Sequence, residues 1–477
     1  MTFHRLGALH PRRIHLIGAG LGAFITAIGV MTVLPAAQTA AISYSTTSSA
    51  TGALDPASFT ATPGISDPAC NAGRGVQFTA PWIANGAPSI AATISGNGST
   101  FVAVTSGYPP HPFVIIHDFG SDCTPDHDFG HDGVATIAFP KLRHSERYTI
   151  TAINAISPAQ SGEIILVGQT TGGWLVGELA QNGRLDARFG QGGWTVLPWP
   201  GQAAAVLQEP SGRIIVAGEA GAGCCVNEWV SALSSSGTLD KHFGVDGRVG
   251  IPSGEDSGVS RLALEPNGDI LALTVAGNMG CWDDLVAALT PNGLPVAGFL
   301  DYFGTNWRSE LVPQGVSTGD LVVRGAGFVL VGTRQQTCVS NTADPTAGGH
   351  MAVFESDGKL ETSFATGGVA TFSSPMQGQV WAFSAAGGDV LMLGMPAPVQ
   401  VENSDSTEAL DLVALLPNGE VDSRYGAGGR AQVQLASLLN DSPGSFVPVT
   451  VAGEGKWIAI VSSTASGKGL QLIRIRS

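Results

Sequence analysis

The chain has 477 residues, of which 43% are hydrophobic and only 13% are charged, and it contains 65 glycines. This composition argues against a coiled coil, whose helices need Glu, Lys and Arg, and against a disordered chain, which lacks apolar surface to bury. Lysine and arginine number 23 against 38 aspartates and glutamates, a net charge of −15 with no basic patch, so we expect no nucleic-acid partner.

The first forty residues have the pattern of an export signal. Arg5, Arg12 and Arg13 precede an apolar run over 16–34, and small residues follow at 36–41. These features predict a secretory signal peptide over 1–40. Because the apolar run is long enough to cross a bilayer, an uncleaved N-terminal membrane anchor stays open. No later segment predicts a membrane span, and we expect an exported protein that is periplasmic, cell-surface or extracellular.

Beyond a Ser/Thr-rich linker over 41–51, one repeated motif fills residues 52–477. The motif is Leu-Asp-x-x-Phe-Gly-x-x-Gly at 185–193 and 239–247, each preceded by an Asn-Gly or Ser-Gly turn, and the same kind of turn and motif start recur at 357–364 and 418–426. Each copy has one aromatic residue, which we call the anchor. The anchors are Phe59, Phe129, Phe189, Phe243, Phe299, Phe364 and Tyr425. Their spacing of roughly sixty residues indicates a repeat architecture.

Each repeat has the pattern of four short strands. Apolar runs such as 163–168 and 174–179 alternate with Gly, Asn and Asp turns, and no apolar spacing of a helical solenoid is present. The pattern predicts an all-β, seven-bladed β-propeller of four-stranded antiparallel blades over 52–477.

The two ends of the chain predict that this ring is closed. The chain ends with a fourth strand, 470–475, that has no turn motif after it, and the repeats begin at 52–55 with a turn motif that has no strand before it. Pairing of the N- and C-terminal segments would complete one blade and hide its edges.

The motif residues have structural roles in this interpretation. We expect the anchor and the leucine four residues before it to be buried between neighbouring blades. The aspartate three residues before the anchor caps the turn. The glycine four residues after the anchor adopts a backbone conformation closed to other residues.

The motif copies at 185–193 and 239–247 resemble the bacterial delta-60 repeat, a β-propeller family of unassigned biochemical function. The resemblance covers nearly all of 52–477, and it is weaker at Phe59, Phe129 and Phe299, where Pro295-Val296 replace Leu-Asp. It implies a propeller at the cell surface or in secreted form and brings no catalytic residues.

The cysteine positions predict disulfides. Residues 62–73 read as an insertion that carries Cys70, and Cys123 occupies the turn-glycine position of the next blade on the same face, so we expect a Cys70–Cys123 disulfide. The other cysteines fall in turns on the opposite face of three consecutive blades, and their pairing stays open, a vicinal bond included. They are Cys224, Cys225, Cys281 and Cys338.

One dense group of ionisable residues could hold a divalent metal ion, although no known ligand spacing supports it. Its members are His117, Asp118, Asp126, His127 and Asp128. The alternative is that residues 126–133 are one more copy of the repeat motif with polar decoration. We therefore expect no obligatory cofactor.

Loop length is the strongest sign of function. The turns near 306–320, 334–349, 397–409 and 436–446 are long and share one face with Tyr108, Trp282 and Trp307. A rigid ring that positions variable loops is suited to binding. These loops could also be tolerated surface insertions.

We therefore expect an exported, monomeric interaction protein with a protein or glycan partner at the cell envelope. The sequence holds no nucleophile motif, so enzymatic activity is not expected. The alternative is an exported hydrolase or lyase that uses carboxylates lining the central channel. A structural component of a larger envelope assembly is a third possibility.

Overall fold

The computed structural model describes residues 66–71, 75–78, 89–106, 113–138, 150–221, 227–251, 257–278, 281–299, 316–334, 349–372, 376–384, 389–396, 409–434, 449–454, 457–463 and 470–476. The chain divides into two units, Met1–Thr32 and Val33–Ser477, and the described residues belong to the second, which is considered by itself. The predicted signal peptide, the linker and Phe59 lie outside the described residues.

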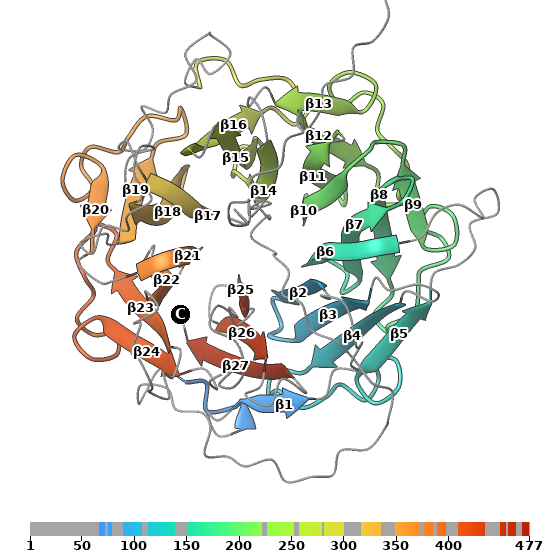
Figure 1. Ribbon diagram of the computed structural model, residues 1–477, viewed down its shortest axis with the longest axis horizontal. Helices are drawn as coiled ribbons and strands as arrows, with labels where there is room; N and C mark the ends of the chain where they lie inside the picture. Colours follow the sequence, from blue (N-terminus) through green and yellow to red (C-terminus); the bar gives the residue numbers. More distant parts are fainter. Residues whose placement is uncertain are drawn as a thin grey trace, which may run out of the picture. The chain divides into compact units, whose positions relative to one another are not determined.

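The strands of the described residues form seven antiparallel sheets, which we number in chain order (Figure 1). Sheet 1 contains β2 (Ser89–Ile94), β3 (Thr100–Ser106), β4 (Phe113–Phe119) and β5 (Val134–Ala138). Sheet 2 contains β6 (Ile150–Pro158), β7 (Ile164–Thr170), β8 (Gly173–Leu179) and β9 (Trp194–Leu197). Sheet 3 contains β10 (Gln202–Gln208), β11 (Ile214–Ala220), β12 (Asn227–Leu233) and β13 (Arg248–Ile251). Sheet 4 contains β14 (Ser257–Leu264), β15 (Ile270–Asn278) and β16 (Cys281–Leu289).

The remaining sheets repeat this arrangement. Sheet 5 contains β17 (Val316–Arg324), β18 (Gly327–Arg334), β19 (Gly349–Phe354) and β20 (Val369–Thr371). Sheet 6 contains β21 (Met376–Ser384), β22 (Val390–Pro396), β23 (Ala409–Leu415) and β24 (Arg430–Gln434). Sheet 7 contains β25 (Val449–Glu454), β26 (Trp457–Ser463) and β27 (Leu470–Arg476), and its fourth strand is β1 (Val76–Phe78). In the described part of the chain, six sheets have four antiparallel strands and sheet 4 has three. A succession of four-stranded antiparallel sheets is the architecture of a β-propeller.

Neighbouring sheets are packed face to face, which is why their middle strands are almost wholly apolar. All seven residues of β8, for example, are buried. The first strand of each sheet contacts the first strand of the next one, from β2 and β6 through to β21 and β25, and β25 in turn contacts β2. Seven clusters of buried apolar side chains fill the spaces between consecutive sheets.

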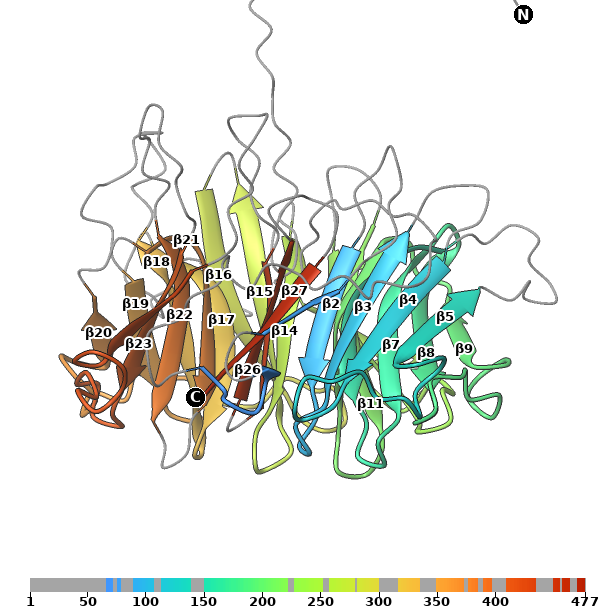
Figure 2. The same ribbon diagram turned by 90° about the horizontal axis from the view of Figure 1, so that it is seen from below.

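Strand direction gives the sheets two different ends. Neighbouring strands alternate in direction (Figure 2), so the connections after the first and third strands leave one end and those after the second and fourth leave the other. The repeat motif lies between the third and fourth strands, at 120–133 in sheet 1 and 180–193 in sheet 2. We call its side the motif end and the opposite side the loop end.

The motif folds as a hydrogen-bonded turn. In sheet 2 the Asp186 amide donates to the Glu178 carbonyl (2.9 Å), the Phe189 amide to the Asp186 carbonyl (2.9 Å) and the Gly193 amide to the Phe189 carbonyl (2.8 Å). The Asp186 carboxylate caps the turn by accepting from the Arg188 amide (2.9 Å). Gly193 has a φ of 99°, as expected for the glycine four residues after the anchor.

The anchors join one sheet to the next. Phe189 is only 1% exposed, and its ring lies so close to Gly237 of the next motif that a Cβ there would stand 2.7 Å from the ring. The amide after the anchor also crosses between sheets, because Gly190 donates to the Ser236 carbonyl (2.8 Å). The same ring-on-glycine contact is made by three other anchors, Phe129 on Gly183, Phe243 on Gly293 and Phe364 on Gly419.

The anchor position between sheets 7 and 1 is occupied by Cys70. The Asp67 amide donates to the Arg474 carbonyl of β27 (3.0 Å) and the Cys70 amide to the Asp67 carbonyl (3.0 Å), as in the other copies. Asn71, the residue after Cys70, has a positive φ of 50°, close to the 49° of Gly190, the residue after Phe189. Residues 66–71 are therefore part of the motif, which corrects the expectation of an insertion over 62–73.

The disulfide lies at this contact, which we call the seam. Cys123 stands at the position of the turn glycine, with a φ of 63°, and it is bonded to Cys70 with a Cα–Cα distance of 4.8 Å. The predicted pair is therefore present. It occupies the place where, in other copies of the motif, an aromatic anchor packs on a turn glycine. Both cysteines are buried with Phe119, Leu470 and Leu472.

An N-terminal strand lies in the same sheet as the C-terminal strands. β1 pairs with β27, with Val76 opposite Leu472 and Phe78 opposite Leu470, and Figure 1 shows the two strands side by side. Arg474 of β27 is buried in the seam, where its guanidinium donates to the carbonyls of Gly98 (2.7 Å) and Ser121 (2.9 Å) in sheet 1.

Candidate functional site

The predicted metal ligands begin with two buried residues of β4. His117 packs against Phe78 of β1, with ring centroids 4.7 Å apart, and burial lowers its pKa to about 4. Asp118 is 4% exposed, and burial together with the charge of Asp126 raises its pKa to about 7. As consecutive strand residues they point to opposite faces of the sheet.

The other three predicted ligands belong to the motif turn after β4. The Asp126 carboxylate caps that turn by accepting from the Asp128 amide (3.0 Å), and the exposed His127 lies 3.3 Å from Asp132. Nowhere in the described residues do three or more His, Cys, Asp or Glu side chains meet in a group that could hold a metal ion. The five residues are spread over two faces of a strand and a turn, so the structure does not assemble the metal site that we considered.

Most of the residues expected on the long loops lie outside the described residues. Tyr108 and Trp307 lie outside the described residues, as do 301–315, 335–348, 397–408 and 435–448. Trp282 and Cys281 lie in strand β16, paired with β15, which corrects the expectation of a turn or long loop there; their side chains are not described. Cys224, Cys225 and Cys338 lie outside the described residues. Their roles in binding and in disulfides stay predictions.

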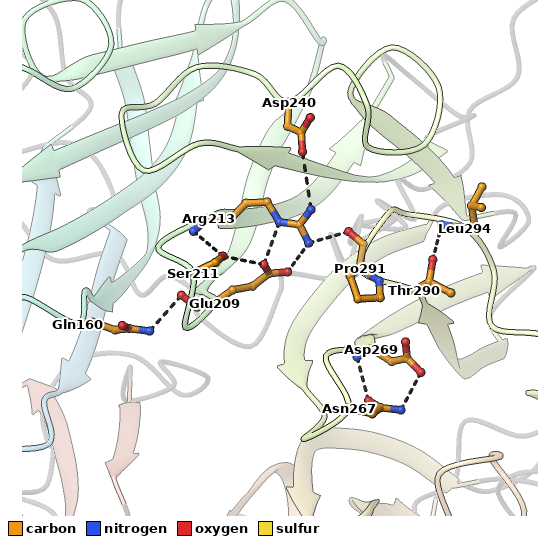
Figure 3. A network of polar contacts seen from close by, with 10 residues as sticks. All are labelled: Gln160, Glu209, Ser211, Arg213, Asp240, Asn267, Asp269, Thr290, Pro291 and Leu294. Carbon is orange, nitrogen blue, oxygen red and sulfur yellow. Dashed lines mark hydrogen bonds and ion pairs between the residues drawn. The ribbon is translucent and has the colours of Figure 1, made fainter.

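A polar network ties the sheets together at the motif end (Figure 3). Arg213 is the centre of this network: its guanidinium donates to the Glu209 carboxylate (2.6 Å) and to the Pro291 carbonyl of sheet 4 (2.6 Å), and it lies 3.7 Å from Asp240. Gln160 of sheet 2 donates to the Glu209 carbonyl (3.0 Å). These charges satisfy one another, so the network holds sheets 2, 3 and 4 together.

The first strands of the sheets contain few acidic residues. Asp320 and Glu454 are the two acids in these strands as the structure describes them. Asp320 is paired with Arg261 of the preceding sheet (2.7 Å) and accepts from the Ala382 amide of the following sheet (3.2 Å). Asp320 is therefore engaged in contacts between sheets, and the side chain of Glu454 is not among those described, so the carboxylate-lined channel of the hydrolase or lyase alternative stays a prediction.

A group of aromatic rings between sheets 2 and 3 was not predicted. Trp199 makes edge contacts with Trp174 (5.4 Å between centroids) and with Trp229 (5.8 Å). The Arg248 guanidinium lies 3.9 Å above the Trp229 ring and 5.7 Å from the Trp199 ring. We call Trp199, Trp229 and Arg248 the tryptophan–arginine site. Its members are far apart in the sequence, and only the pairing of β12 with β13 brings Trp229 and Arg248 to one face.

Comparison with family models finds no match for this chain. Comparison with curated proteins finds none either. Among solved structures the chain is similar to the polysaccharide lyase Uly1, with 10% identity and a TM-score of 0.41 over 81% of this chain and 89% of that one. It is also similar to a PL25 ulvan lyase bound to -[GlcA(1-4)Rha3S]-, with 10% identity and a TM-score of 0.43 over 80% of this chain and 91% of that one.

A third similar structure is the GH93 α-L-arabinofuranosidase of Fusarium graminearum with arabinobiose, at 8% identity and a TM-score of 0.33 over 81% of this chain and 92% of that one. Similarity at this level does not transfer an activity to this chain. Within the described residues, no helix is both long and apolar enough to cross a membrane.

Proposed function

We propose that this chain is an exported, closed seven-bladed β-propeller of the delta-60 type that binds a protein or glycan partner at the cell envelope. The circuit of contacts between first strands, which returns from β25 to β2, supports one ring, and the pairing of β1 with β27 supports its closure. The Cys70–Cys123 disulfide fits an oxidising compartment.

The difference between the two ends of the sheets carries the binding proposal. At the motif end the turns repeat one hydrogen-bond pattern and are locked to neighbouring sheets. At the loop end the connection between the second and third strands varies from the two-residue 171–172 of sheet 2 to 335–348 of sheet 5 and 397–408 of sheet 6. A rigid scaffold with one uniform end and one variable end is suited to recognition through the variable end.

A pair of matched variants tests this proposal. In the first, 335–348 and 397–408 are each replaced by Thr-Gly, the connection that sheet 2 already uses at 171–172. In the second, the exposed motif-end residues Arg188 and His242 are changed to alanine. Purified proteins lacking residues 1–40 are applied to a glycan microarray and to isolated cell envelopes. We expect the first variant to lose binding and the second to retain it.

Loss of binding only in the motif-end variant would contradict the proposal. The same proteins are incubated with the polysaccharides that bind on the array. New reducing ends or unsaturated sugars would favour the hydrolase or lyase alternative instead.

A further inference from the structure

Among the buried and half-buried arginines whose side chains the structure describes, Arg248 alone has no carboxylate partner in the described part of the chain. Each of the other buried or half-buried arginines that the structure describes is paired with a carboxylate, namely Arg213 with Glu209, Arg261 with Asp320, Arg324 with Glu361 and Arg474 with Asp67. Arg248 is also half-buried, yet its side chain makes no hydrogen bond or ion pair within the described part of the chain, and its guanidinium lies over tryptophan rings.

The guanidinium of Arg248 is held in a fixed place. Below it, Trp229 contacts Trp199, and Trp199 contacts the fully buried Trp174. Trp174 is fixed in turn, because its Nε1 donates to the Glu219 carbonyl (2.9 Å). Stacking on the rings stabilises the cation and leaves the N–H groups at its edge free to donate.

A second donor lies beside the guanidinium. The Nε1 of Trp229 has no acceptor among the described residues, and Gly250 is the residue paired with Trp229 across β12 and β13. Gly250 is exposed, and because it has no side chain it leaves this edge of the indole uncovered. A Cβ at this position would lie 3.6 Å from Nε1. The Arg248 guanidinium over the Trp229 ring and the Nε1 of the same ring are therefore two donors near each other at the contact of sheets 2 and 3.

An anion would complete this site. A half-buried charge without a counter-charge is costly, and a carboxylate or a sulfate accepts two hydrogen bonds from a guanidinium. The net charge of −15 repels any polyanion at long range, so recognition depends on the two local donors, and an acidic sugar chain offers them an anionic group together with neighbouring hydroxyl and ring oxygens. We propose that Arg248 and Trp229 bind the carboxylate or sulfate group of an acidic polysaccharide.

This inference rests on the proposed binding function and names a ligand class for it. The test is titration with oligogalacturonate and with a sulfated galactan oligosaccharide, followed by tryptophan fluorescence and calorimetry. A neutral galactan oligosaccharide, polyglutamate and inorganic sulfate are titrated in parallel. We expect at least one acidic oligosaccharide to bind and the neutral one not to bind.

Three variants locate the site. Arg248→Met keeps much of the packing on Trp229 but removes the charge, and we expect affinity to fall about tenfold or more. Gly250→Val keeps Arg248 and covers the indole edge, and we expect a similar loss. Arg430→Gln is the matched control, because Arg430 begins β24 as Arg248 begins β13 and has no ion pair or ring contact in the described part of the chain.

The outcomes separate this inference from the proposed function. Binding of polyglutamate alone, equal binding of the neutral sugar, no binding of either acidic sugar, or unchanged affinity in both site variants would overturn the inference. If the Arg248→Met protein still binds its partner on the array or the envelopes through the loop end, the proposed function stands without this site. Thermal unfolding of each variant shows whether it is folded.

Discussion

Two buried carboxyls stand at a repeat position that is apolar in most other copies. Asp118 and Glu178 are the third-strand residues whose carbonyls accept the amide of the motif aspartate. The residues at this position in sheets 3 to 6 are Ala232, Ala288, Val353 and Ala414. Burial is the main cause that raises the pKa of both Asp118 and Glu178 to about 7. The charge of Asp126 adds to the rise at Asp118, and the charges of Asp186 and Glu163 add to the rise at Glu178.

The raised pKa values predict a pH dependence of stability. Between about pH 4 and pH 7 the folded chain keeps protons that the unfolded chain has released, so the contribution of these carboxyls to stability is present below about pH 4 and is lost as pH rises through 7. The double variant Asp118→Asn, Glu178→Gln is therefore expected to unfold a few degrees higher than the wild type at about pH 8, and the gain should vanish near pH 4.

The measurement is the unfolding temperature of both proteins from pH 4 to 8. Comparing variant with wild type removes the opposite effect of His117, whose lowered pKa makes stability fall as pH falls. Asp128→Asn, at an exposed carboxylate, is the control. A constant difference across this range would show that the two carboxyls do not titrate as described.

At the scale of elements, the seam shows where prediction from the sequence motif was wrong. Leu54-Asp55 and Phe59 match the letters of the motif better than Ser66-Asp67 and Cys70 do. The hydrogen bonds of the motif are nevertheless made by Asp67 and Cys70, which restores a spacing to Phe129 close to that of the other anchors. The backbone pattern needs a capping aspartate and a residue that tolerates positive φ, and the anchor need not be aromatic when a covalent bond replaces it.

The seam therefore predicts a specific rescue. Cys70→Ser with Cys123→Ser removes the bond without replacing it, and we expect the free energy of unfolding to fall by about 2–5 kcal/mol. Cys70→Phe with Cys123→Gly installs the ring and glycine that other sheets use, so we expect part of that loss to be recovered. Denaturant unfolding of the three proteins measures both effects. Equal instability of the two double variants would mean that Cys70 does not stand at an anchor position.

At the scale of the whole molecule, the all-β class and the positions of the repeats after the first could be predicted, because a motif that recurs about every sixty residues reports on each of these sheets. The tryptophan–arginine site could not, because its contacts depend on which strands pair and on which faces meet. Trp229 and Arg248 are diagonal neighbours across β12 and β13, and Trp199 reaches them from sheet 2. The five residues considered as metal ligands are close in sequence, but they lie on the two faces of β4 and in the turn after it.

The central claim is that a strand near the N-terminus completes the sheet formed by the C-terminal strands. Gln77 of β1 is paired with Gln471 of β27. The most direct test is the chain with Gln77→Cys and Gln471→Cys, oxidised in the native state and digested without reduction for mass mapping of its peptides. The account predicts that peptides carrying positions 77 and 471 are joined, whereas a control pair, Gln77→Cys with Ser462→Cys of β26, is not. Joining of the control pair with positions 77 and 471 left unlinked would contradict the closed ring.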